Sequence, residues 1–246
     1  MANLEGSVAV VTGSSRGIGA AVAKRLASGG AAVVVNYAHG QAEADQVVQV
    51  IEEKGGTALA VKADISTPGG VEALFDAAEQ TFGGADILVN NAGTMKLGAI
   101  ADVADEHFER QVALNFTGVF RGMRVAAQRL RDGGRIISFS SSVAGLYQPG
   151  YGVYAATKAA VEAMTHVLAK ELGPRGITVN AVSPGPVATA FFLNGKTEEQ
   201  VEAIAQMNPF KRLGQPEDIA ALVAFLASGE GGWVNGQVIR VNGGVI

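Results

Sequence analysis

The chain has 246 residues, a formal net charge of −4, a hydrophobic fraction of 48% and no cysteine. A negative balance argues against a nucleic-acid role, which would need Lys and Arg concentrated on one face. The lack of cysteine excludes disulfides and thiolate chemistry, and the scattered His39, His107 and His166 lack metal-ligand spacing, so we expect no metal site. The first residues do not resemble a secretory signal, and no apolar stretch approaches the ~20 residues of a membrane span, so we expect a cytoplasmic protein.

Short apolar runs alternate with helical patterns along the whole chain. Strands are predicted at 8–12, 32–36, 57–62, 86–90, 135–140, 178–182 and 237–241. Helices are predicted at 17–28, 42–54, 69–81, 105–130, 153–172 and 216–227. Apolar strands separated by helices indicate an α/β fold of the doubly wound Rossmann type, a parallel sheet with helices on both faces. No linker interrupts the pattern, so we expect a single domain over 1–246.

A glycine-rich turn follows the first predicted strand and reads Gly13-Ser14-Ser15-Arg16-Gly17-Ile18-Gly19. Glycines allow a tight turn and a close approach to a ligand, and the free amides of a helix start attract phosphate. The spacing differs from the Gly-x-Gly-x-x-Gly of the common dinucleotide fingerprint. The turn therefore indicates either a dinucleotide phosphate site or close packing alone.

Tyr154 and Lys158 lie four residues apart, on one face of the helix predicted at 153–172. The ordinary pKa of a tyrosine is ~10, and an ammonium group one helical turn away would lower it. A serine run, Ser140-Ser141-Ser142, lies upstream and offers a hydroxyl for a substrate oxygen. The pair predicts acid–base chemistry, with a solvated surface pair as the alternative.

Several motifs along the chain have a family resemblance. They are Thr12-Gly13-x-x-x-Gly17-x-Gly19, Asn90-Asn91-Ala92-Gly93, Asn115, the serine run, Tyr154-x-x-x-Lys158, Ser183-Pro184-Gly185 and Val241-Asn242-Gly243-Gly244. In order and spacing the set resembles the short-chain dehydrogenase/reductase family, and within it the 3-oxoacyl-carrier-protein reductase-like ketoreductases. The resemblance implies that Tyr154 donates a proton to a small-molecule ketone, or accepts one from an alcohol. It also implies that Lys158 binds the nicotinamide ribose and that Asn115 holds a proton-relay water.

Two alignments of the serine run disagree by one residue. The match on Ser142-Val143-Ala144-Gly145 selects Ser142, twelve residues before Tyr154, whereas a thirteen-residue separation selects Ser141. We favour Ser142 as the catalytic serine, because the length of the loop at 146–150 varies more readily than the strand end that aims a side chain.

Cofactor contacts are expected beyond the carboxyl ends of the predicted strands. Asp64 would bind the adenine amino group or simply cap a helix, and Asn90 would line the ribose. The full predicted set is Gly13, Ser15, Arg16, Gly17, Ile18, Gly19, Asn36, Tyr37, Ala38, Asp64, Ile65, Asn91, Ala92, Gly93, Tyr154, Lys158, Pro184, Gly185, Val187 and Thr189.

The charge pattern near the second strand predicts which dinucleotide binds. Enzymes that prefer NAD usually place a carboxylate at this strand end, where it repels a 2′-phosphate. Here the segment Val35-Asn36-Tyr37-Ala38-His39 carries none, and no acid appears before Glu43. Arg16 supplies a cation for the phosphate. The predicted cofactor is therefore NADP(H), with a solvated Arg16 as the alternative.

A substrate lid is expected at about 187–209, where Phe191, Phe192 and Leu193 are apolar and Gly195 offers a hinge. The leading interpretation is an NADPH-dependent carbonyl reductase. A 3-oxoacyl-carrier-protein reductase is the first alternative, with a basic approach at Arg129, Arg131 and Arg175. A non-catalytic dinucleotide-sensing protein is the second. The family resemblance, with the small residues Ala159, Ala160 and Ala163 on one helix, also predicts a homotetramer.

Overall fold

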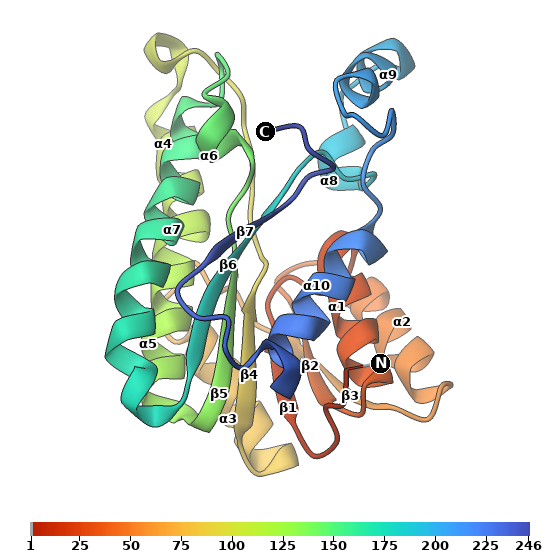
Figure 1. Cartoon of the computed structure of the whole chain (residues 1–246), viewed down its shortest axis with the longest axis vertical. Coiled ribbons are helices and arrows are strands. Elements are labelled where there is room, and N and C mark those ends of the chain that lie inside the picture. The colour runs from red at the N-terminus through yellow and green to blue at the C-terminus, as the bar shows by residue number, and fades with distance from the viewer. Residues whose placement is uncertain (1) are drawn as a thin grey trace.

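Seven strands form one sheet in the order β3-β2-β1-β4-β5-β6-β7 in the computed structural model, which describes residues 2–246 (Figure 1). Every neighbouring pair is parallel. The strands are β1 (Val8–Val11), β2 (Ala32–Tyr37), β3 (Thr57–Lys62), β4 (Ala85–Asn90), β5 (Leu130–Phe139), β6 (Thr178–Pro184) and β7 (Val238–Val241). The direction of winding reverses between β1 and β4, which places a ligand site beyond the carboxyl ends of these strands.

Helices cover both faces of the sheet, as the doubly wound prediction requires (Figure 1). Alternate residues of β1 divide the core: Ala9 and Val11 pack on one face, and Val8 and Val10 on the other. The first face carries α1 (Gly17–Ser28), α2 (Gln41–Glu52) and α10 (Pro216–Ala227). The second carries α3 (Gly70–Phe82), α5 (Val119–Arg129) and α7 (Gly152–Leu172). The predicted fold class is therefore confirmed.

The helix predicted at 105–130 is divided into three parts. It consists of α4 (Asp105–Val112), a π-helical segment (Ala113–Gly118) and α5. Single π-helical turns within helices often occur at functional sites, and this one contains Asn115. The short helices α6 (Val143–Leu146), α8 (Ala190–Leu193) and α9 (Glu198–Gln206) were not predicted, because two of them are a single turn long and give little periodicity.

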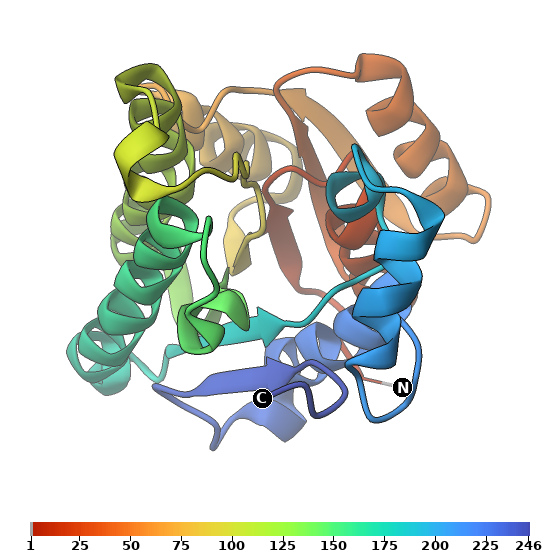
Figure 2. The same ribbon diagram turned by 90° about the horizontal axis from the view of Figure 1, so that it is seen from above.

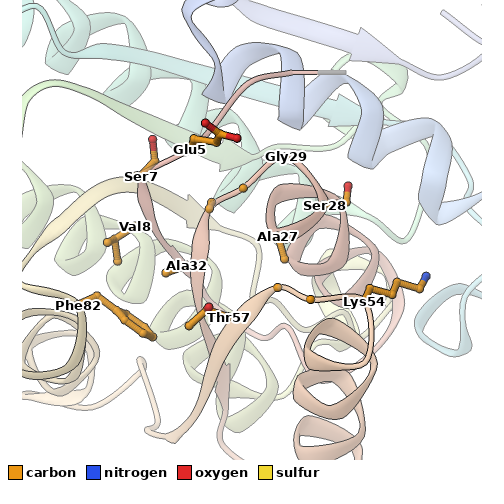
Figure 3. Close-up of a pocket in the computed structure, with 15 residues that line it drawn as sticks. Glu5, Ser7, Val8, Ala27, Ser28, Gly29, Ala32, Lys54, Thr57 and Phe82 are labelled. Atoms are coloured by element: carbon orange, nitrogen blue, oxygen red, sulfur yellow. The ribbon is translucent and has the colours of Figure 1, made fainter.

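A cavity of about 530 Å³ lies beside the amino ends of three strands, next to Val8, Ala32 and Thr57 (Figure 3). This edge of the sheet is opposite the one at which the predicted site residues gather. The cavity is therefore separate from the candidate site. Within residues 2–246, no helix combines the length and the apolar character needed to cross a bilayer.

Candidate active site

The glycine-rich turn connects β1 to α1 and needs its glycines for two reasons. Gly13 and Gly17 have φ angles of +61° and +56°, in the left-handed region that favours glycine. A Cβ atom on Gly13 would also lie 2.9 Å from the Cα atom of Ala92, and one on Gly17 would lie 3.5 Å from Thr189 Cγ2. The turn is thus tight, and it brings the segments after β4 and β6 against the start of α1.

Three asparagines at the strand ends hold the site together through their side chains. The Gly13 amide donates to Asn36 Oδ1 at 3.0 Å, and Asn36 Nδ2 donates to the Ala63 carbonyl at 3.0 Å. Asn91 Nδ2 donates to the carbonyls of Thr12 and Gly13. Asn90 is buried and donates to Ser138 Oγ at 3.1 Å, and its contact with the ribose stays a prediction. The side-chain amides of Asn36 and Asn91 thus hold the start of the glycine-rich turn.

The remaining residues predicted to contact the adenosine half differ in exposure. Tyr37 and Ile65 are buried in the two core clusters, whereas Ala38 is half-buried. Asp64 Oδ1 accepts from the amide and the hydroxyl of Ser66, so it caps a local turn. Arg16 is exposed at the start of α1 and forms no ion pair with the residues that the structure describes. Ser15 and Ile18 beside it are half-buried.

Tyr154 and Lys158 lie on the inner face of α7, 8% and 3% exposed. Lys158 Nζ donates to the Phe139 carbonyl at 2.8 Å and lies 5.6 Å from the centroid of the Tyr154 ring. The alternative of a solvated surface pair is thereby excluded. Ser141, two residues after β5, lies near enough for its hydroxyl to lower the pKa of Tyr154.

Ser142 faces a different part of the structure. It is 2% exposed, its Oγ accepts from Asn242 Nδ2 at 3.0 Å, and its hydroxyl donates to the Ser183 carbonyl at 3.4 Å. Neither partner belongs to the Tyr154–Lys158 pair. The geometry therefore favours Ser141 over Ser142 as the serine beside Tyr154, against the sequence-based preference, because the hydroxyl of Ser142 is bonded to Ser183 and Asn242.

Asn115 is fully buried in the π-helical segment. Its Oδ1 accepts from the Thr94 amide and its Nδ2 donates to the Thr94 carbonyl, both at 2.8 Å. A Cβ atom on Gly93 would lie 3.3 Å from Asn115 Oδ1 and 3.8 Å from Lys158 Nζ. The amide thus holds the segment after β4 beside the lysine. Its role in holding a relay water stays a prediction.

The segment after β6 lies against the glycine-rich turn. Pro184 and Val187 are buried, and the Gly185 amide donates to the Val241 carbonyl at 3.1 Å. Thr189 begins α8 and faces Gly17 across the turn. The predicted lid consists of α8, α9 and their connections. In Figure 2 the lid (light blue) and α6 (green) lie on opposite sides of the carboxyl edge of the sheet. Phe191, Leu193 and Met207 of the lid are exposed.

Burial dominates the acidity of both catalytic candidates. Burial raises the pKa of Tyr154 to about 12, and the hydrogen bond with Ser141 offsets part of that rise. Burial lowers the pKa of Lys158 to about 8. The expected lowering of the Tyr154 pKa by Lys158 is therefore wrong for this chain by itself. The physical reason is that burial of the phenol raises its pKa by more than its polar neighbours lower it.

The lowered pKa of Lys158 predicts a pH-dependent stability. From about pH 8 upward the folded protein releases this proton, while the unfolded chain keeps it until its ordinary pKa of 10.5. The unfolded state then binds more protons, so this residue makes the free energy of unfolding rise with pH across that window. Urea unfolding of the parent and Lys158→Met at about pH 7.5 and pH 9.5 measures the effect. Parallel pH dependences of the two proteins would contradict it.

Comparison with known proteins agrees with this geometry. A family model described as Enoyl-(Acyl carrier protein) reductase matches residues 13–246. The chain is 49% identical over 253 residues to a short-chain type dehydrogenase/reductase of Picea abies, covering 99% of this chain and 93% of that protein. The chain belongs to the short-chain dehydrogenase/reductase family. This short-chain dehydrogenase/reductase is therefore an oxidoreductase, as the motifs predicted.

Two further relatives have more specific descriptions. An NADPH-dependent aldehyde reductase-like protein, chloroplastic, of Arabidopsis thaliana is 48% identical over 257 residues, which cover 99% of this chain and 95% of that protein. The crystal structure of the angucycline C-6 ketoreductase LanV with bound NADP superposes with a TM-score of 0.94 at 40% identity, covering 99% of this reductase and 97% of LanV.

Proposed function

We propose that this reductase converts ketones or aldehydes to alcohols with NADPH, using Ser141, Tyr154 and Lys158. The observation that carries the proposal is the meeting of Ser141 and the Tyr154–Lys158 pair at the carboxyl edge of the sheet, beside Gly93 and the glycine-rich turn. A binding module would have no use for a buried phenol next to a buried ammonium group, so this arrangement favours an enzyme over a dinucleotide sensor.

The residues around the turn fit a dinucleotide with a 2′-phosphate. The twelve-residue helix α1 begins at Gly17, and the amides of a helix start attract a pyrophosphate. Arg16 is exposed beside it and free to pair with the extra phosphate. NADP(H) is the cofactor named for LanV and for the Arabidopsis relative, and NADP(H) is the cofactor of this chain. When bound, it supplies the hydride that reduces the carbonyl carbon.

Residues of the chain itself supply and place the proton that reaches the carbonyl oxygen. A pKa of about 12 keeps the Tyr154 hydroxyl protonated at neutral pH, as a proton donor requires. The Ser141 hydroxyl acts on the pKa of the Tyr154 phenol, so the two hydroxyls are near neighbours and can both hold one carbonyl oxygen. Lys158 is anchored by the Phe139 carbonyl, with its Nζ atom 5.6 Å from the centroid of the Tyr154 ring, so its positive charge lies beside the residue that gives up the proton. In the direction of alcohol oxidation, Tyr154 accepts the proton instead.

The two serines are expected to differ in their effect on turnover. Ser141→Ala removes the hydroxyl that meets Tyr154, and a neutral hydrogen bond to the substrate oxygen is worth about 1–1.5 kcal/mol, so kcat should fall about tenfold. Ser142→Ala should reduce kcat less, because its hydroxyl faces Ser183 and Asn242. Steady-state kcat for both variants measures the order. A larger loss in Ser142→Ala would restore the sequence-based assignment.

The three arginines expected to attract an acidic acyl-carrier protein do not lie near the site. All three candidate arginines flank the amino ends of β5 and β6, at the edge opposite the site. Each is ion-paired within the chain: Arg129 with Asp76, Arg131 with Asp86 and Arg175 with Asp132. Near the site, α9 instead exposes the carboxylates of Glu198, Glu199 and Glu202, which would repel an acidic carrier protein at this helix.

A substrate panel tests the proposal directly. NADPH consumption is followed at its absorbance band with an aldehyde, a linear ketone, a fused-ring ketone of the angucycline type and a 3-oxoacyl-carrier protein. We expect turnover of the free carbonyl compounds, and no gain in kcat/KM when an acyl group is attached to the carrier. A kcat/KM at least ~10²-fold higher for the carrier-bound group would favour the alternative.

The predicted homotetramer is part of the proposal. The outer side of α7 carries the exposed small residues Ala159 and Ala163 next to the exposed Val167, which suits close contact with another helix. Phe108 and Phe120 of α4 and α5 are also exposed. Light scattering should give the mass of four chains, and a stable active monomer would contradict it. The cytoplasmic location stays a prediction.

A further inference from the structure

Asn242 lies directly after β7, outside the residues predicted for the site, yet its side chain and main chain together contact three segments around the site. It is 8% exposed, and its Nδ2 donates to Ser142 Oγ at 3.0 Å. A Cβ atom on Gly185 would lie 2.9 Å from Asn242 Cβ, so the segment after β6 packs directly against this asparagine. Asn208, at the end of the lid, donates to the Asn242 carbonyl at 2.8 Å.

The hydrogen bonds around Asn242 have a defined direction. Asn242 Oδ1 accepts from the Gly244 amide at 3.0 Å, so the amide nitrogen is the atom that faces Ser142. The Ser142 oxygen therefore accepts, and its own proton points to the Ser183 carbonyl at 3.4 Å. The Ser142 main-chain amide also donates to the Pro184 carbonyl at 2.9 Å. The hydroxyl and the main-chain amide of Ser142 are thus both bonded to the carboxyl end of β6.

These bonds determine where the neighbouring residue Ser141 can point. Residue 142 is held against β6 from its side chain and its main chain, and it shares a peptide bond with Ser141. Without the bond from Asn242, the buried Ser142 oxygen loses its donor, and the strand end loses the contact that joins it to β7. The position of the Ser141 hydroxyl relative to Tyr154 then becomes less well defined.

We propose that Asn242 is a positioning residue for proton transfer. Through Ser142 it sets the placement of Ser141 relative to Tyr154 and to the Pro184–Val187 segment. This inference rests on the proposed reductase function. Because a displacement of about 1 Å in a reacting group can cost up to ~10²-fold in rate, we expect Asn242→Ala to lower kcat several-fold, about as much as Ser142→Ala and less than Ser141→Ala. The Kd for NADPH should change less than about threefold, because the glycine-rich turn and Arg16 remain intact.

A double-mutant cycle separates this role from general destabilisation. Asn242→Ala and Ser142→Ala each remove the same hydrogen bond, so the double variant should be no slower than the slower single variant. The matched control is Asn180→Ala. Asn180 is also a buried asparagine, and it also forms two hydrogen bonds that tie β6 to the segment before β7, with the Val234 carbonyl and the Gln237 amide. Asn180 lies in the amino-terminal half of β6, away from the carboxyl edge where the site residues gather.

The measured quantities are kcat, KM for the ketone, Kd for NADPH and Tm for all four variants and the parent. We expect Asn180→Ala to lower Tm as much as Asn242→Ala while kcat stays within about twofold of the parent. Independent, multiplicative losses of kcat in the double-mutant cycle would overturn the proposal. So would a kcat unchanged in both Asn242→Ala and Ser142→Ala. If Tyr154→Phe stayed active, the proposed function would fail instead, so the two failures are distinguishable.

Discussion

Tyr154→Phe is expected to lower kcat by at least ~10²-fold, the usual scale for losing a positioned general acid. Tyr154 is almost completely buried on the inner face of α7, so phenylalanine fills the same space and the helix should keep its packing. Only the hydroxyl that meets Ser141 disappears. The Kd for NADPH should therefore stay within a few-fold of the parent value. Steady-state kinetics with a ketone and a fluorescence titration with NADPH measure the two quantities.

Tyr151→Phe is the matched control for this substitution. Tyr151 lies three residues earlier, at the start of α7, and is half-buried. Tyr151→Phe also removes one phenol hydroxyl, yet the expected change in kcat is below about threefold, because Tyr151 lies outside the Tyr154–Lys158 pair. Turnover of Tyr154→Phe within tenfold of the parent would remove Tyr154 from its role. It would also revive the hypothesis of a dinucleotide-sensing protein.

Arg16→Ala is expected to weaken NADPH binding about ten- to a hundred-fold and to change NADH binding much less. A charge-assisted contact with a phosphate is worth on the order of 1.5–3 kcal/mol in a partly exposed site. Arg16 is exposed at the start of α1 and has no internal carboxylate partner in the described chain, so it is available to the 2′-phosphate. The ratio of kcat/KM for NADPH and NADH in the parent and in the variant is the measurement.

Arg25→Ala controls for the loss of one positive charge. Arg25 is exposed in the last turn of the same helix, so the net charge changes equally while the distance to the turn is large. This variant should keep the parent preference. If Arg16→Ala weakened both cofactors equally, or if the parent preferred NADH, Arg16 would not be reading the phosphate.

A carboxylate at the end of β2, combined with Arg16→Ala, should reverse the cofactor preference from NADPH to NADH. The structure restricts where it can be placed. Asn36 holds the glycine-rich turn and Tyr37 is buried against the core, so a charge at either position would be desolvated. Ala38 is half-buried and follows directly. Arg16→Ala with Ala38→Asp is thus the variant expected to prefer NADH, by repelling the phosphate and binding the free ribose hydroxyl.

Much of the fold follows from local sequence signals. The predicted bounds of α1, β3 and α10 agree with the structure, because each is bounded by strong local markers such as the glycine-rich turn or Pro216 at a helix start. Continuous apolar strands required a sheet covered on both faces. The placement of Tyr154 and Lys158 on one side of α7 follows from helical periodicity alone. The sequence by itself therefore determined the family, the architecture and the central pair.

Only the tertiary structure decided which partners the polar side chains near the site contact. Ser141 and Ser142 are identical residues in one run, but their surroundings differ. Asn242, 100 residues further along the chain, donates a hydrogen bond to Ser142 Oγ. Asn36 and Asn91 resemble ligand contacts in the sequence, yet they hold the glycine-rich turn. The physical reason is common to these cases: a side chain's role depends on partners that distant segments bring to it, and residue order does not specify those partners.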